Sequence, residues 1–131
     1  MTIEDLKKKF AEGWPPVLDV GPGWIPLVLE CDRELSEIDP GYKIHQIKEK
    51  FGGLRYYILN SCTSETSETD RDDMIDTMAK IISKYEALAL QTCEVTGKPG
   101  RWAQCQDSKW LKTLSQEVID SDPKYSTYKF K

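Results

Sequence analysis

Apolar residues recur at helical spacing near the amino terminus of the chain. Ile3, Leu6 and Phe10 lie three and four positions apart, which gives one apolar helix face. Thr2 precedes them, and its side-chain oxygen suits a helix cap because it can accept a backbone amide hydrogen. The segment 13–16, Gly-Trp-Pro-Pro, ends this predicted helix, since proline lacks the amide donor and restricts φ.

A second apolar stripe follows a loop rich in glycine and proline. Its members recur at helical spacing and are Leu27, Val28, Cys31, Leu35 and Ile38. Trp24 opens the predicted helix, and Pro26 is tolerated because it falls in the first turn. Residues 39–41, Asp-Pro-Gly, end it in a turn, because proline sets φ and glycine accepts a positive φ.

The clearest helical periodicity lies between residues 70 and 91. Its apolar positions recur three, four and seven apart and are Met74, Ile75, Met78, Ile81, Ile82, Tyr85, Leu88 and Ala89. Thr69 is suited to cap this helix, and the acidic residues after it lie near the positive end of the helix dipole. We predict that 70–91 forms the central helix of the fold, after a polar surface loop at 60–69.

The stretch between the second and third helices alternates as β-structure does. Residues 42–49 and 54–59 predict a β-hairpin around Gly52-Gly53. Its second strand places Leu54, Tyr56 and Ile58 on one face. In the first strand Ile44 and Ile47 are three positions apart, so a β-bulge between them is needed to keep both on one face.

The carboxyl-terminal part mixes the two patterns. Residues 101–105 predict a short strand, and a last helix is predicted from Asp107 or Ser108 onwards, burying Trp110, Leu111, Leu114 and Val118. The tail 123–131 either adds an edge strand or stays loose. Together these elements predict an α+β fold: a small antiparallel sheet, the β-hairpin 42–59, packed by about four helices in a single domain of residues 1–131.

The composition is that of an ordinary globular protein, with 39% apolar and 31% charged residues among 131. No run approaches the roughly 20 apolar residues of a membrane helix, and the amino terminus lacks the apolar core of a signal peptide. The cysteines at 31, 62, 93 and 105 are interpreted as reduced thiols in a cytoplasm. Cys31 and Cys105 fit as small apolar fillers and Cys62 as an exposed loop thiol.

Charge is unevenly distributed along the chain. The net charge of −4 argues against a general nucleic-acid binder, which would be basic. Residues 42–58 nevertheless carry four basic side chains and one acidic one, whereas residues 61–73 carry five acidic side chains and Arg71. The molecule is therefore polarised, with a basic hairpin beside an acidic connector.

The basic hairpin is the candidate binding site. Cations interleaved with aromatic rings suit phosphate contacts and base stacking. Alternatively, the aromatic residues belong to the core and the charges form a solvated rim; the sequence leaves both interpretations open. The candidate binding residues are Lys48, Lys50, Phe51, Arg55, Tyr57 and Arg101. Arg101 is one of four cations, with Lys98, Lys109 and Lys112, that would extend the surface if the segment after Cys93 packs beside the hairpin.

No catalytic residue is assigned, and the protein is predicted not to be an enzyme. His45, the single histidine, could shuttle a proton, but without a nucleophile motif a surface or hydrogen-bonded role is favoured. Glu49 could act as a general base, although its two lysine neighbours favour a salt bridge. Gly52-Gly53 lacks the strand-loop-helix context of a phosphate-binding loop. No cofactor is expected.

Residues 93–100, Cys-Glu-Val-Thr-Gly-Lys-Pro-Gly, look like half of a zinc knuckle, a turn that offers two cysteines two residues apart. This turn and residues 47–57, Ile-Lys-Glu-Lys-Phe-Gly-Gly-Leu-Arg-Tyr-Tyr, preceded by Gly23-Trp24, resemble a family of small phage- and prophage-encoded proteins, mostly of unassigned function. The resemblance covers about residues 23 to 118.

The resemblance implies four zinc ligands, of which this chain keeps one. Cys93 fills the first position, whereas Thr96, Ser115 and Val118 fill the other three. These side chains cannot replace thiolates and imidazole around zinc, and Cys105 would supply only a second ligand. No bound metal is therefore expected.

The function that follows is an expectation built on this resemblance and on the missing catalytic constellation. We expect a non-enzymatic phage or prophage accessory protein that binds a macromolecule in the host cytoplasm, foremost a host protein, and inhibits it. The alternative is a nucleic-acid or nucleotide-binding module that uses the basic aromatic hairpin 42–58. A third possibility is that the acidic connector 61–73 mimics the charge of nucleic acid.

Overall fold

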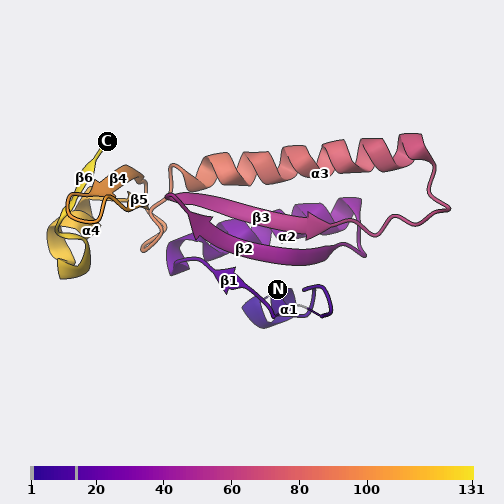
Figure 1. Ribbon diagram of the computed structural model, residues 1–131, viewed down its shortest axis with the longest axis horizontal. Coiled ribbons are helices and arrows are strands. Elements are labelled where there is room, and N and C mark those ends of the chain that lie inside the picture. Colours follow the sequence, from indigo (N-terminus) through magenta and orange to yellow (C-terminus); the bar gives the residue numbers. More distant parts are fainter. Residues whose placement is uncertain (1, 14) are drawn as a thin grey trace.

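The computed structural model describes residues 2–13 and 15–131 of the chain. Its helices are α1 (Ile3–Lys7), α2 (Ile25–Ile38), α3 (Glu68–Ala89) and α4 (Gln116–Ser121), with short 3-10 turns η1 (Pro22–Trp24) and η2 (Pro123–Tyr125). Its strands are β1 (Leu18–Asp19), β2 (Lys43–Lys50), β3 (Gly53–Leu59), β4 (Arg101–Cys105), β5 (Leu111–Leu114) and β6 (Tyr128–Phe130). The strands form two three-stranded sheets, and the predicted α+β class is confirmed (Figure 1).

The first sheet contains the predicted hairpin. Its strand order is β1-β2-β3, with β1 parallel to β2 and β2 antiparallel to β3. Ile44 pairs with Ile58 and Gln46 pairs with Tyr57, so His45 is the extra residue of a β-bulge. The predicted bulge is thereby confirmed, and it places both Ile44 and Ile47 in the core, fully buried.

The first hydrophobic core lies between this sheet and the helices. In Figure 1, α2 lies behind β2 and β3, and α3 runs along the edge of β3. Helix α3 contacts both α2 and β3, and it buries Met78, Tyr85 and Ala89. The Glu86 carboxylate accepts the outward-pointing amide of Tyr56 at 3.3 Å, which satisfies a free edge group of β3. The opposite face of the hairpin carries no helix among the described residues.

The start of α3 differs from the prediction. The helix begins at Glu68, and its cap is Ser67, whose hydroxyl accepts the amide of Asp70 at 3.1 Å. Thr69 is therefore inside the first turn and is not the cap. Ser67 has the extended backbone that a cap requires, with φ −63° and ψ 152°.

Helix α1 is shorter than its apolar stripe suggested. The Thr2 cap is confirmed, since its hydroxyl accepts the Asp5 amide at 3.2 Å. The helix ends at Lys7, however, because the next residues pair with β2: the Ile44 amide donates to the Lys9 carbonyl at 2.9 Å. The segment 13–16 therefore does not end the helix, and Trp14 within it lies outside the described residues.

A buried polar network joins the segment after α1 to the core. Asp32 on α2 is fully buried and accepts two hydrogen bonds from the Lys9 ammonium, at 2.9 and 3.0 Å. The Tyr42 hydroxyl also donates to Asp32, and it lies 2.8 Å from the Tyr56 hydroxyl. A buried carboxylate would be costly without such partners, so the network holds the segment after α1, helix α2 and the sheet in one arrangement.

The second sheet was predicted only in part. Its order is β5-β4-β6 and both pairings are antiparallel, over a small core of Cys93, Ala103, Leu114 and Val118. The predicted strand 101–105 is confirmed as β4, and the tail adds the edge strand β6. In Figure 1 this sheet lies beyond the turn that joins β2 to β3.

The predicted last helix from Asp107 or Ser108 is wrong. Residues 106–109 turn the chain, with Lys109 at φ 66°, and β5 then pairs with β4. Only the short α4 after Ser115 is helical, and Trp110, expected in the core, is 65% exposed. Pairing with the distant β4 overrides the local helical spacing of the apolar residues.

No helix in the described part of the chain is long and apolar enough to cross a membrane.

Candidate functional site

The turn between β2 and β3 is the hairpin tip, residues 50–53. Phe51 and Gly52 are its two central residues, and both have a positive φ, of 55° and 77°. A type I′ turn requires this of both central residues, and glycine, asparagine and aspartate adopt it readily. The turn is thus shifted by one residue from the predicted Gly52-Gly53, because Gly53 pairs with Lys50 as the first residue of β3.

The second sheet holds the hairpin tip from one side. The Trp102 indole Nε1 donates to the Phe51 carbonyl at 2.9 Å, and the Thr113 hydroxyl donates to the Gly52 carbonyl at 2.7 Å. A Cβ atom on Gly52 would lie 2.6 Å from Trp102 Nε1, so only glycine fits there. The tip is therefore a rigid junction between the two sheets.

A buried charge cluster reinforces this junction. The Lys112 ammonium on β5 donates to Glu49 on β2 and, at 3.4 Å, to Glu94. Glu94 also accepts the Thr113 amide at 2.7 Å. The predicted salt bridge of Glu49 is present, although its partner is Lys112 and not a neighbouring lysine of β2.

Burial and pairing act in opposite directions on the pKa values of Glu94 and Lys112. Burial raises the pKa of Glu94, and the hydrogen bonds from Thr113 and Lys112 only partly offset it. Burial alone would lower the pKa of Lys112, but its pairing with Glu49 and Glu94 raises it. The Lys112 ammonium lies closer to Glu49 than to Glu94. Its charge therefore offsets only part of the effect of burial on the pKa of Glu94.

Two cavities flank the hairpin tip, and we call them the tip cavities. The first has a volume of about 420 Å³ and is lined by Lys48, Glu49, Lys50, Phe51, Ser108, Lys109, Trp110 and Leu111. The second has a volume of about 430 Å³ and is lined by Lys50, Phe51, Gly53, Arg55, Leu90, Trp102 and Leu111. Phe51 and Lys50 border both, so the Phe51 side chain, 63% exposed, separates two concave sites.

Four of the six predicted binding residues meet at these cavities. Lys48, Lys50, Phe51 and Arg55 line one or both. Tyr57 shares the outer face of the hairpin with them, opposite Gln46, and is 42% exposed without lining either cavity.

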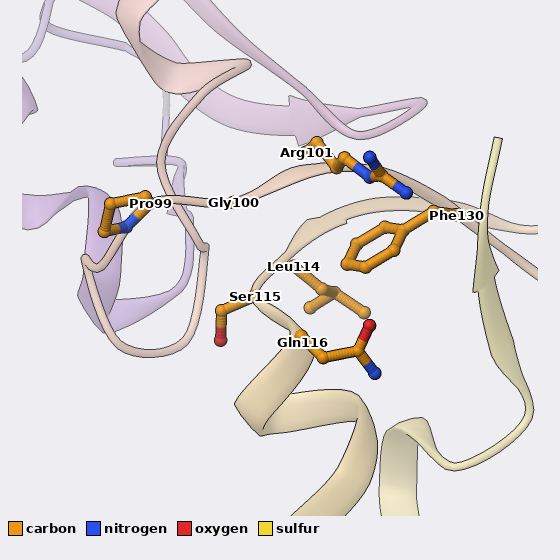
Figure 2. A pocket seen from close by; sticks show the side chains of 7 residues that line it. All are labelled: Pro99, Gly100, Arg101, Leu114, Ser115, Gln116 and Phe130. Carbon is orange, nitrogen blue, oxygen red and sulfur yellow. The ribbon is translucent and has the colours of Figure 1, made fainter.

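Arg101 lies elsewhere. Its guanidinium carbon lies 4.1 Å from the centroid of the Phe130 ring, above a shallow depression of about 380 Å³ that also contains Leu114 and Gln116 (Figure 2). The neighbouring Trp102 points to the hairpin tip, so Arg101 points to the opposite face of β4. Arg101 therefore does not extend the hairpin site, although the second sheet does pack beside it.

Sequence reasoning missed the aromatic half of the site. Trp102 and Trp110 are 42% and 65% exposed, and each lines one tip cavity. Lys109, by contrast, was among the cations expected to extend the hairpin surface, and it lines the first cavity at the turn before Trp110. Of the other expected cations, Lys98 pairs with Glu117 and Lys112 with Glu49. The signal was present, since residues 101–112 alternate cations with tryptophans, but the helical interpretation placed Trp110 in the core.

The two interpretations of the hairpin aromatics apply to different residues. Tyr56 is 3% exposed and belongs to the core, as the solvated-rim alternative supposed. Phe51 and Tyr57 are exposed beside the cations, as the binding alternative supposed. The outer face of the hairpin therefore presents exposed aromatic rings beside cations, while Tyr56 belongs to the core.

The half-knuckle turn forms part of the second core. Cys93 is fully buried, and hydrogen bonds from Thr96 and from the amides of Val95 and Ser115 lower its pKa although burial acts in the opposite direction. Of the positions that the resemblance assigns to zinc ligands, Thr96 thus contributes its side chain and Ser115 its backbone amide at the Cys93 sulfur, while the Ser115 hydroxyl accepts the Val118 amide at 3.3 Å. Across residues 2–13 and 15–131, no three His, Cys, Asp or Glu side chains are grouped to hold a metal ion.

Cys62 and Cys105 do not line the tip cavities. Cys105 is 8% exposed in β4, and hydrogen bonds from Ser108 and Thr127 lower its pKa to about 7. Cys62 is half-buried in the loop before α3, 3.5 Å from the Met74 sulfur, and is less exposed than expected.

The chain matches no protein-family model, no curated protein and no solved structure. Its candidate site is therefore characterised by its own side chains. They present three exposed aromatic rings and four cations around two cavities at a rigid turn.

Proposed function

We propose that this chain is a non-enzymatic accessory protein of a phage or prophage that binds a host macromolecule through the hairpin tip and inhibits it. The resemblance of residues 23–118 to a phage and prophage family supports the origin. The tip cavities support the binding role, because concave sites with aromatic and cationic linings are typical of recognition surfaces.

The observation that carries the binding role is the conformation of Phe51. A bulky residue at a φ of 55° costs roughly 1–2 kcal/mol relative to an ordinary backbone conformation, and its ring is 63% exposed. Folding alone gains little from such an arrangement. Strained residues that the surrounding structure holds in place cluster at functional sites, and exposed aromatic residues are frequent hot spots of interfaces.

The chemistry of the tip favours binding over catalysis. The cavity linings offer ammonium and guanidinium groups, aromatic faces and the Ser108 hydroxyl. The carboxylate that lines a cavity, Glu49, is already paired with Lys112. Among the described lining residues no nucleophile stands beside a free base, which covalent or acid–base catalysis would require.

An affinity capture from bacterial lysate tests the proposal. Tagged wild-type protein, Phe51→Asn and Trp110→Ala are compared with Leu59→Ala, a control that removes an exposed side chain at the far end of β3. We expect the wild type and the control to retain a defined partner that both tip variants lose. The partner's activity should fall when wild-type protein is added and stay unchanged with Phe51→Asn.

Each lysate is divided into nuclease-treated and untreated halves. A partner retained in both halves is a host protein, whereas one lost on treatment is held through nucleic acid. Retention that is equal for the wild type and both tip variants, or absent from all of them, would contradict the proposal.

A further inference from the structure

The tip cavities combine the features that unpaired nucleotides require. We propose that they bind single-stranded nucleic acid, with bases stacked on Phe51 and the two tryptophans and phosphates held by the surrounding cations. This inference rests on the proposed function in that the same hairpin tip is the binding surface. It goes beyond it by naming the chemical class of the partner.

The first argument is charge complementarity. Lys48, Lys50 and Lys109 line the first tip cavity, and the opposing carboxylate of Glu49 is paired with Lys112. The cavity is therefore positive although the chain carries a net charge of −4. A polyanion is the partner that such a local cluster attracts, because each phosphate contact releases a condensed counterion.

The acidic part of the chain lies far from this surface. Figure 1 places the connector between β3 and α3 at one end of the first sheet and the turn between β2 and β3, next to the second sheet, at the opposite end. Arg55, in the second cavity, is close enough to Glu86 to lower that carboxyl's pKa, although burial outweighs this and raises the pKa overall. Within residues 2–13 and 15–131, the lysines of the first cavity, Lys48, Lys50 and Lys109, form no salt bridge, and the carboxylate beside them, Glu49, is paired with Lys112.

The second argument is the placement of the rings. Phe51 and Trp110 line the first cavity, and Phe51 and Trp102 line the second, so three exposed rings follow one another across the tip. Lys50 and Lys131 lie 5.5 and 5.6 Å from the centroids of Phe51 and Trp102. Consecutive bases stack on rings arranged in this way, and cations nearby reach the phosphates between them.

The same geometry favours single strands over duplexes. Bases in a duplex are stacked on one another, so their faces cannot reach the rings, whereas unpaired bases can be splayed into concave sites. The two cavities, of about 420 and 430 Å³, are concave and lie on either side of Phe51. Stacking needs no particular base, so we expect binding that tolerates sequence.

Fluorescence anisotropy with a labelled oligothymidylate of about 15 nucleotides, within the length that small single-strand sites occupy, tests the inference. We expect binding by the wild-type protein that weakens as salt rises, with a logarithmic slope of about −2 if three phosphates are neutralised. Phe51→Asn and Trp110→Ala should each weaken binding roughly tenfold, the usual effect of losing one stacked base. A duplex of the same length should compete poorly.

Two matched pairs of variants separate site from fold. Lys50→Glu and Lys43→Glu make the same charge change at opposite ends of β2, and only Lys50→Glu should weaken binding strongly. Likewise Leu59→Ala should bind as the wild type does. Melting curves of all variants establish that each is folded.

The outcomes distinguish this inference from the proposed function. It is overturned if the oligonucleotide does not bind, or binds equally well to Phe51→Asn and Trp110→Ala, since purely ionic attraction needs no rings. If binding is absent while lysate capture still yields a nuclease-resistant partner that depends on Phe51, the partner is a protein and only this inference fails. If both experiments are negative, both proposals fail.

Discussion

Phe51 and Gly52 are neighbours with positive φ that serve different purposes. Gly52 is required by space, because a side chain there would collide with the Trp102 indole at 2.6 Å. Phe51 is not required by its turn, since asparagine, aspartate and glycine suit a type I′ position better. A ring is therefore kept at the tip at a cost in stability, which is the usual sign of a functional residue.

This contrast predicts a gain in stability from losing the ring. Phe51→Asn creates the Asn-Gly pair that favours type I′ turns and should raise the free energy of unfolding by about 1 kcal/mol. Phe51→Ala removes the ring but keeps a residue that disfavours positive φ, so it should gain less. Urea unfolding of the three proteins measures this. A clear loss of stability in Phe51→Asn would show that the ring supports the fold.

At the scale of elements, the spacing of apolar residues predicted a helix or strand correctly where one face of that element packs against the core. The hairpin, its bulge at His45 and helix α3 follow from alternation and helical spacing, because each buries one face against the first core. The pattern failed at residues 107–118, whose apolar spacing fits a helix. There β5 forms instead, since its pairing with β4 lies outside any local window.

The half-knuckle turn is the element with a chemical prediction. The Thr96 hydroxyl and the Ser115 backbone amide lie at the Cys93 sulfur, so cysteines at these two positions would start from backbone close to one point. We predict that the unaltered protein melts at the same temperature with and without chelator. The triple variant Thr96→Cys, Ser115→Cys and Val118→His should bind zinc stoichiometrically and melt at a higher temperature with it.

Metal content and melting curves with and without chelator measure both expectations. Adding Cys93→Ser to the triple variant is the control, because it removes the ligand around which the others lie and should abolish zinc binding. Stoichiometric zinc in the unaltered protein would contradict the prediction that no metal is bound.

At the scale of the whole molecule, the two hydrophobic cores are joined at the hairpin tip and by further hydrogen bonds beside it. The Trp24 indole donates to the Thr92 carbonyl at 2.8 Å, and the Gly23 amide donates to the Glu94 carbonyl at 2.8 Å. The cluster of Glu49, Lys112 and Glu94 completes the junction. That the chain is a single domain stays a prediction, which depends on how strongly these contacts couple the cores.

The buried carboxylate of this junction predicts a pH dependence. Because burial raises the pKa of Glu94 above its ordinary value of 4.5, the ionised form costs stability at neutral pH. Protonation removes that cost as the pH falls. Glu94→Gln has no such titration, so the stability of the wild type relative to this variant should rise between neutral pH and about 4.5.

Unfolding of both proteins over this pH range measures the difference. The variant also serves as the control for the titrating groups that do not contact Glu94, because their surroundings are the same in both proteins. The opposite trend, a relative loss of wild-type stability in acid, would show that pairing with Lys112 outweighs burial at Glu94.

The sequence by itself determined the α+β class, the hairpin with its bulge, the helices α2 and α3, and the gathering of cations near Phe51. These depend on interactions between residues close in the chain and on one buried face per element. The tertiary structure alone decided the second sheet, the exposure of Trp102 and Trp110, and the separation of Arg101 from the site. Each of these results from pairing or packing between distant residues, which no local pattern encodes.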